Sequence, residues 1–320
     1  MLQKEFGLLI KAMRREMACL RGEKWTQTEL ARRANATPKI ISNLERGTKA
    51  RIEPELLYGL ANAFQLSLSE RMAFFSLANT ISEEALVPPS QPPQETIRPL
   101  LTILANARQP AFLVDALDNV IAANSLLFGM FPFLRRLLAE PQTFPGAYNA
   151  MRFVFSSESG FAERVTHNRE VYLRQSLYRF RVMTLPYRAT RYYYEMMQYF
   201  CQHPEMHLFA TMYAQRLSEQ PCPPASHITF TLPAEERAVS ISAITAAPMN
   251  TPHGPLYLVL HIPADTQTLK YFNHLAGSGP AAVHTLAPWP LQIEWMEFED
   301  EEEDEPQDEE EQPEPQMQDA

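Results

Sequence analysis

The chain has 320 residues, more than one ordinary domain holds, which favours two domains. Hydrophobic residues make up 45% of it, enough for buried cores, and no apolar run approaches the roughly 18–20 residues of a membrane-spanning helix. Only three cysteines occur, with no Cys-x-x-Cys pair. This disfavours a disulfide scaffold and a cysteine-based zinc site, and it predicts a cytoplasmic protein.

The formal net charge of −10 is unevenly distributed along the chain. Residues 297–319 contain 14 acidic and no basic side chains, so the charge of residues 1–296 is +4. Residues 1–80 alone carry 13 basic and 8 acidic side chains, a balance of +5. A basic N-terminal segment combined with an acidic C-terminal tail predicts a nucleic-acid-binding surface in the N-terminal segment.

The first 80 residues are predicted to form a succession of short helices. Charged residues are mixed into the apolar pattern of residues 1–20, which predicts an amphipathic helix and not a signal peptide. Thr26 is expected to cap the next helix, with Glu29 as its capping-box partner. Thr37-Pro38 starts a third helix that Gly47 ends, and further helices are expected from Pro54 and over 67–78.

Two of these helices carry a recognisable motif. The sequences Thr-Gln-Thr-Glu-Leu-Ala-Arg-Arg-Ala (26–34) and Thr-Pro-Lys-Ile-Ile-Ser-Asn-Leu-Glu-Arg-Gly (37–47) are separated by a tight turn. Such a pair lays its second helix into the DNA major groove. Over about residues 5–78 the chain resembles the XRE family of helix-turn-helix regulators, which implies a DNA-binding transcription regulator.

The resemblance assigns DNA contacts by position. Gln27 is expected to contact the DNA backbone, and Lys39 and Asn43 to read guanine and adenine. Arg46, Lys49 and Arg51 suit phosphate contacts. Pro38 stands where the family often has a polar residue. The complete predicted DNA-binding set is Gln27, Thr37, Pro38, Lys39, Ser42, Asn43, Arg46, Lys49 and Arg51.

Beyond a Pro-rich linker, the sequence predicts both helices and strands. A helix over 97–106, a strand from Ala111, an Asp-Asn turn, a second strand from Val120 and a helix capped by Asn124 are predicted in that order. Residues 147–217 are expected to be helical, and three strands follow before a helix over 264–275. This order predicts an α+β fold, a PAS-like sandwich with a helical insertion.

Residues 109–124 resemble the opening of the MmyB-like ligand-binding domain, which follows an XRE domain in a family of bacterial regulators. The helix over 151–155 and the strand over 257–262 fit the same order. The resemblance implies a small-molecule sensor, with a fatty acid among the plausible ligands. The domains are therefore predicted as 1–80 (DNA-binding), 81–96 (linker), 97–276 (ligand-binding) and 277–320 (extension with a disordered acidic tail).

Methionine and aromatic side chains at helical spacing are the candidates for the ligand pocket, because such side chains adapt to apolar ligands. Four nearby arginines offer cations for a carboxylate: Arg179, Arg181, Arg188 and Arg191. The last two belong to the predicted set. The predicted ligand-binding set is Phe153, Phe155, Arg188, Arg191, Tyr193, Met196, Met197, Phe200, Phe209 and Tyr213. Stripes of this kind also occur in ordinary helical cores, so the pattern alone leaves both interpretations open.

Enzymatic function is not expected. The eight histidines are scattered, and no phosphate-binding loop, nucleophile motif or metal-ligand pattern occurs, so neither a metal nor a cofactor is predicted. Dimerisation is expected because paired helix-turn-helix domains read two half-sites. Two alternatives remain: a C-terminal domain that is a protein-interaction or dimerisation module without a small ligand, or a PAS-like domain that holds haem or flavin.

Overall fold

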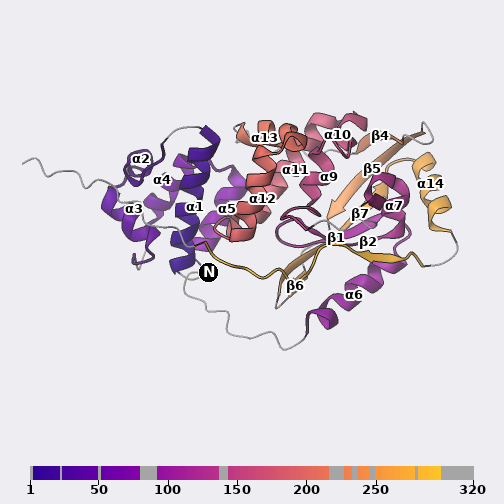
Figure 1. The fold of residues 1–320 in the computed structure, drawn as a ribbon, viewed down its shortest axis with the longest axis horizontal. Helices are drawn as coiled ribbons and strands as arrows, with labels where there is room; N and C mark the ends of the chain where they lie inside the picture. The colour runs from indigo at the N-terminus through magenta and orange to yellow at the C-terminus, as the bar shows by residue number, and fades with distance from the viewer. Residues whose placement is uncertain are drawn as a thin grey trace, which may run out of the picture.

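The computed structural model describes residues 3–21, 24–49, 52–79, 92–136, 143–215, 227–232, 237–245, 249–251, 253–277 and 280–296. Arg51, most of the predicted linker and the acidic tail lie outside these ranges. The described residues form a helical N-terminal domain (3–79) and an α+β C-terminal domain (92–296), which lie side by side in Figure 1. The mixed α+β fold predicted from the sequence is confirmed.

The N-terminal domain consists of α1 (Gln3–Arg21), α2 (Gln27–Ala34), α3 (Pro38–Glu45), α4 (Pro54–Ala63) and α5 (Leu68–Asn79). Each helix contributes apolar side chains at helical spacing to one core, which includes Phe6, Leu30, Ile41, Leu60 and Phe74. The five predicted helices are thus present in their predicted order.

Two glycines allow these helices to pack closely. A Cβ atom on Gly7 of α1 would lie 2.5 Å from the carbonyl oxygen of Leu44 at the end of α3. A Cβ atom on Gly59 of α4 would lie 2.1 Å from the carbonyl oxygen of Ala34 at the end of α2. Both separations are too short for real atoms, so any larger residue would force α1 and α4 away from the α2–α3 pair.

The C-terminal domain begins with α6 (Pro93–Asn106), β1 (Ala111–Val114), β2 (Val120–Asn124), α7 (Ser125–Met130) and the 3₁₀ turn η1 (Pro132–Leu134). Asn124 caps α7 as predicted, because its side chain accepts a hydrogen bond from the Leu127 amide. The last residues assigned to the linker are helical instead, since Pro93 occupies the first turn of α6, where its missing N–H costs nothing.

A helical layer follows in sequence. It comprises α9 (Ala150–Phe155), α10 (Phe161–Arg164), α11 (Arg169–Thr184), η2 (Leu185–Tyr187), α12 (Arg191–Gln202), η3 (Pro204–Met206) and α13 (His207–Ala214). The short strand β3 (Val165–His167) interrupts the segment that the sequence predicts as wholly helical. It forms because Val165 and His167 pair with β4 (Ile228–Leu232) across more than 60 residues of sequence.

The remaining elements are β4 (Ile228–Leu232), β5 (Arg237–Thr245), β6 (Met249–Thr251), β7 (Gly254–Pro263), α14 (Thr266–Ala276) and β8 (Val283–Thr285). Among the described residues the strands form one antiparallel sheet in the order β3-β4-β5-β7-β1-β2-β8, with β6 paired to β7. Strand β8 and the segment that follows it belong to the domain, whereas the sequence predicts its end at residue 276.

The sheet separates two apolar layers. One face packs against α7, the helices α9–α13 and α14, around residues such as Val114, Phe230 and Phe272. The opposite face packs against α6 through Leu100 and Leu104. Within the described residues no helix is long and apolar enough to cross a membrane.

Candidate nucleic-acid interface and ligand cavity

The α2–α3 pair is shaped by local capping. Thr26 Oγ1 accepts a hydrogen bond from the Glu29 amide at 3.1 Å, and Thr37 Oγ1 accepts one from the Ile40 amide at 3.4 Å. Asn35 adopts a left-handed conformation (φ 53°) that ends α2 and turns the chain toward α3. Both predicted N-caps are confirmed, although the Glu29 carboxylate pairs with the guanidinium groups of Arg32 and Arg33.

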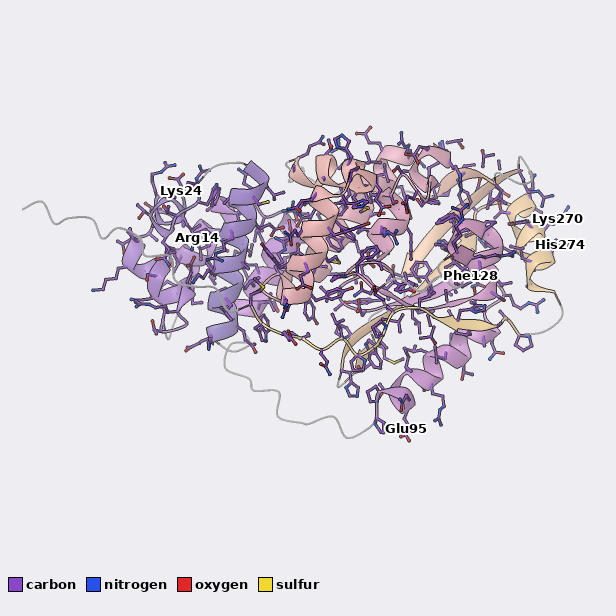
Figure 2. All side chains as sticks on the ribbon, viewed as in Figure 1. Arg14, Lys24, Glu95, Phe128, Lys270 and His274 are labelled. Atoms are coloured by element: carbon purple, nitrogen blue, oxygen red, sulfur yellow. The ribbon has the colours of Figure 1, made fainter. Side chains whose placement is uncertain are left out.

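A buried ion pair fixes the two helices on α1. Arg14 Nε donates to Glu45 Oε1 at 2.8 Å, its Nη2 donates to Glu45 Oε2 at 3.1 Å, and its Nη1 donates to the Trp25 carbonyl at 2.7 Å. Gln27 Nε2 donates to the same carboxylate at 3.0 Å. Arg14 lies inside the N-terminal domain (Figure 2), so Glu45 orients Gln27 at the first turn of α2 from within the fold.

The outward face of α3 carries the predicted base-reading residues. Pro38, Lys39 and Arg46 are exposed, and Ser42 and Asn43 are partly exposed. Asn43 Oδ1 accepts a hydrogen bond from Arg46 Nη2 at 2.8 Å, which orients the amide beside the guanidinium group. Lys49 pairs with Glu53 at 3.0 Å and Thr37 is occupied as a cap. Helix α3 lies at the end of the molecule away from the sheet, where DNA can reach it (Figure 1).

Comparison with protein families now identifies this domain. Residues 18–71 match the Helix-turn-helix family HTH_3. The N-terminal domain is an XRE-type helix-turn-helix domain. This supports DNA binding and transcription regulation as the function of the helix-turn-helix domain. The match ends within α5, so the MmyB-like character of the C-terminal domain stays a prediction, and comparison with curated proteins finds no match.

The C-terminal domain contains an apolar cavity between the sheet and the helical layer. Its volume is about 70 Å³, and a second cavity of about 160 Å³ adjoins it. Phe112, Tyr172 and His261 line both cavities, so the two cavities share a wall. The rest of the apolar cavity is lined by aliphatic and aromatic side chains, among them Phe131, Phe153 and Phe161.

Buried polar atoms without a hydrogen-bond partner occur on Arg179 and His261, which line the second cavity, and on Asp118, which pairs with Arg179. Arg179 Nη2 pairs with Asp118 Oδ2 at 2.9 Å, while its Nη1 is buried without a hydrogen bond. The buried Nδ1 atom of His261 and the Oδ1 atom of Asp118 also have none. Burial lowers the pKa of His261 to about 4, so this ring is neutral at pH 7. Burial raises the pKa of Asp118, although Arg179 opposes the shift. Unmade hydrogen bonds of this kind are costly, and a polar ligand could make them.

The predicted ligand-binding residues do not gather around one cavity. Phe153 lines the apolar cavity, whereas Arg188, Tyr193 and Met197 line a different cavity of about 260 Å³ between α12 and α1. Arg191 is exposed and pairs with Glu195. The other five are buried in the core of the C-terminal domain: Phe155, Met196, Phe200, Phe209 and Tyr213.

The structure also narrows the choice of arginine for a carboxylate. Arg181 and Arg188 are paired with glutamates of the N-terminal domain, and Arg191 faces solvent. Arg179 is the one of the four that lines the second cavity.

Sequence reasoning missed the roles of His261 and of Arg14 and Glu45, because their partners lie on separate elements. Within the described residues no cluster of histidine, cysteine or acidic side chains is arranged to hold a metal ion.

Proposed function

We propose that this transcription regulator is a ligand-responsive sensor and not an enzyme. Its C-terminal domain, MmyB-like and PAS-like in our proposal, binds an apolar molecule with an anionic group, and a fatty acid fits this description. The observation that carries the proposal is the apolar cavity together with the second cavity beside it, which is lined by Arg179, whose buried Nη1 atom lacks a partner. Ligand binding is proposed to alter operator binding by the N-terminal domain.

The proposed mode of DNA binding follows from the exposed face of α3. Lys39 donates to guanine, and Asn43 pairs with adenine after giving up its bond to Arg46. Gln27, held by Glu45, donates to a phosphate, as do Arg46 and Lys49. Two chains in a homodimer would place two such helices on the half-sites of an operator. Sedimentation of the purified chain tests the dimer, and selection from random duplexes supplies the operator.

The proposed mode of ligand binding uses both cavities. An alkyl chain would occupy the aromatic cavity around Phe131 and Phe161, because burial of apolar surface drives such binding. The carboxylate would accept hydrogen bonds from Arg179, since charge-assisted bonds to guanidinium are strong. Tyr172 and His261, which line both cavities, would have to adjust to join them. A carboxylate in this position competes with Asp118 for Arg179.

Thermal unfolding of the full chain, first stripped of lipid, tests the ligand. Saturating C12–C18 fatty acids should raise the melting temperature, because a ligand that binds only the native state stabilises it. Their methyl esters and the Arg179→Gln variant should show a much smaller rise. Arg174→Gln is the matched control, since Arg174 lies on the same helix and pairs with Glu170 at the surface. If no acid shifts the melting of the stripped protein, the sensor proposal is wrong.

The two alternative functions are separated by simple measurements. A visible absorption band in the purified protein would indicate haem or flavin in place of a fatty acid. A colourless protein that melts identically with every acid would favour a protein-interaction or dimerisation module. Native mass spectrometry of the protein before stripping identifies any lipid that copurifies with it.

A further inference from the structure

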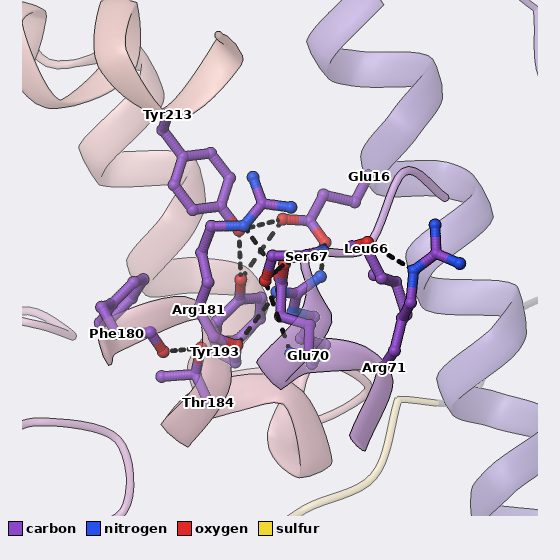
Figure 3. Close-up of polar contacts among 11 residues, drawn as sticks. Glu16, Leu66, Ser67, Glu70, Arg71, Phe180, Arg181, Thr184, Tyr193 and Tyr213 are labelled. Atoms are coloured by element: carbon purple, nitrogen blue, oxygen red, sulfur yellow. Dashed lines mark hydrogen bonds and ion pairs between the residues drawn. The ribbon is translucent and has the colours of Figure 1, made fainter. Parts of the chain in front are cut away.

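The two domains meet at a polar group that we call the interdomain cluster, formed by Glu16, Glu70, Arg181, Arg188, Tyr193 and Tyr213 (Figure 3). Four of these residues are buried, and Glu16 and Arg181 are partly buried. Its first half surrounds Glu70 of α5. Glu70 Oε1 lies 2.9 Å from Arg181 Nε and 3.0 Å from Arg188 Nη2. Glu70 Oε2 accepts hydrogen bonds from the amide and hydroxyl of Ser67 at 3.0 and 2.7 Å. Burial opposes the charge on Glu70, but the two arginines and Ser67 outweigh it and lower its pKa to about 2.

The second half of the cluster surrounds Glu16 of α1. The Tyr213 hydroxyl donates to Glu16 Oε1 at 2.6 Å, and the Tyr193 hydroxyl lies 3.3 Å from the same oxygen. The two hydroxyls are 3.0 Å apart. Arg188 Nη1 lies 3.5 Å from Glu16 Oε2, so this one guanidinium group bridges Glu16 and Glu70. In Figure 3 these side chains converge from helices of both domains.

Apolar contacts run alongside the cluster. Leu185 of η2 is fully buried in the core of the N-terminal domain, although it belongs to the C-terminal domain by sequence. Conversely, Leu20 of α1 packs against the core of the C-terminal domain. The Tyr178 hydroxyl of α11 donates to Ser69 of α5. The C-terminal domain therefore supplies part of the interior of the N-terminal domain, and α1 covers part of the core of the C-terminal domain.

The charges explain why this contact is specific. The N-terminal domain contributes two carboxylates and the C-terminal domain two guanidinium groups, so the cluster is neutral only when the domains meet. Buried ion pairs add little net stability, because the charges lose water, but a mismatched partner would leave a buried charge unpaired. Such a contact selects one docked arrangement and can still separate, which is what a two-state element requires.

Helix α11 connects this cluster to the ligand cavity. It carries Arg179 at the cavity and Arg181 in the cluster, two residues apart. In an α-helix that spacing corresponds to roughly 200° of rotation and 3 Å along the axis, so the two side chains leave opposite faces of one rigid rod. The chain continues directly into η2, which supplies Leu185 and is followed by Arg188. A shift of α11 at the cavity is thus transmitted to both the ionic and the apolar parts of the contact.

We propose that the interdomain cluster is the coupling element of the regulator: it docks the helix-turn-helix domain on the C-terminal domain, and α11 makes that docking depend on the occupancy of the cavity. The coupling rests on the proposed function, whereas the docking does not. Docking leaves α3 facing away from the sheet (Figure 1), so it sets the orientation of the DNA-reading helix and does not cover it.

Hydrogen exchange of the full chain without ligand tests the docking. In Glu70→Gln, peptides of α5 and η2 should exchange about tenfold faster or more, because loss of one partner of a buried pair is strongly destabilising. Peptides of α2 and α3 should stay close to wild type, which distinguishes undocking from unfolding. Gln at this position can still complete the Ser67 capping box. Glu29→Gln, at a surface pair of the N-terminal domain, is the matched control and should change neither α5 nor η2.

A second variant tests the docking independently, in case Glu70→Gln fails to fold. Tyr193→Phe/Tyr213→Phe removes only the two hydroxyls at Glu16 and keeps both rings, so faster exchange in α1, α5 and η2 there also supports docking through the cluster. If both variants leave α5 and η2 at wild-type rates, or if α2 and α3 open to the same extent, the cluster is not a docking element.

Addition of hexadecanoic acid to the lipid-stripped protein tests the coupling. The acid should change α5 and η2 exchange by about fivefold or more in the wild type. Glu70→Gln should still bind the acid, with an affinity that differs from wild type by about the same factor because the coupling is reciprocal, but it should show no further change in α5. Acid that binds wild-type protein without altering α5 and η2 overturns the coupling and leaves the proposed function intact. Acid that does not bind refutes the proposed function and the coupling with it, while the ligand-free comparison still decides the docking.

Discussion

Leu185 gives the sharpest test of the shared interior, because it is encoded with the C-terminal domain and buried in the core of the N-terminal domain. Leu177 lies eight residues earlier, is equally inaccessible, and packs in the core of the C-terminal domain. Replacement of a fully buried leucine by alanine costs about 3–5 kcal/mol, since transfer energy is lost and a cavity is left behind. Leu185→Ala and Leu177→Ala should therefore be similarly destabilising, but in different domains.

The assay is native-state hydrogen exchange on the full chain. A loss of about 3 kcal/mol corresponds to roughly 100-fold faster exchange where the exchange rate follows the free energy of opening. For Leu185→Ala this acceleration is expected in α1 and α5, and for Leu177→Ala in α9 and α13. The reasoning would be refuted if Leu185→Ala accelerated exchange in α9 and α13 and left α1 and α5 at their wild-type rates.

Three further predictions concern DNA binding and pH. Lys39→Ala and Asn43→Ala should each reduce the binding free energy at the selected operator by about 1–3 kcal/mol and relax base preference there. Lys49→Ala should instead weaken binding to all duplexes and flatten its salt dependence. Titrations at several salt concentrations measure both effects. Residues 297–320 lie outside the described structure, and their deletion should strengthen binding to random duplex more than to operator at low salt. The reason is that a tethered polyanion competes with DNA phosphates for the basic side chains. Equal affinities of full-length and truncated protein for random duplex would show that the tail does not compete. Burial lowers the pKa of His261 to about 4 in the folded state, below its unfolded value of about 6.5. The contribution of His261 to stability is therefore complete above pH 6.5 and declines as the pH falls toward 4. The His261→Phe variant should show a smaller fall in melting temperature between pH 6.5 and pH 4.

Features set by local chemistry could be predicted from the sequence. Thr26, Thr37 and Asn124 cap helices as expected, because a cap depends on residues within one turn. The helix-turn-helix motif is equally local, and its family match confirms it. The strands β3 and β8 were not predicted, since each has three residues and exists only by pairing with a distant strand.

Features that depend on two distant segments could not be predicted. Glu70 completes a capping box with Ser67, which depends on residues within one turn, but its other oxygen binds Arg181 and Arg188 more than 100 residues away. Those arginines were assigned to a ligand carboxylate because nothing near them in sequence neutralises them. The predicted pocket residues are spread over two cavities and the core for the same reason. Helical stripes identify buried faces, and only the packing shows which of those faces borders a cavity.

The order of synthesis gives the shared interior a consequence for folding. The N-terminal domain leaves the ribosome first, but Leu185 follows Asn79 by about 100 residues. At 5–20 residues per second, the helices α1 to α5 wait roughly 5–20 s for the side chain that completes their core. During that interval Glu16 and Glu70 remain hydrated and the site for Leu185 stays open. A nascent chain at this stage exposes an apolar surface that a chaperone could cover, and the contact between the two domains forms only when the C-terminal domain arrives.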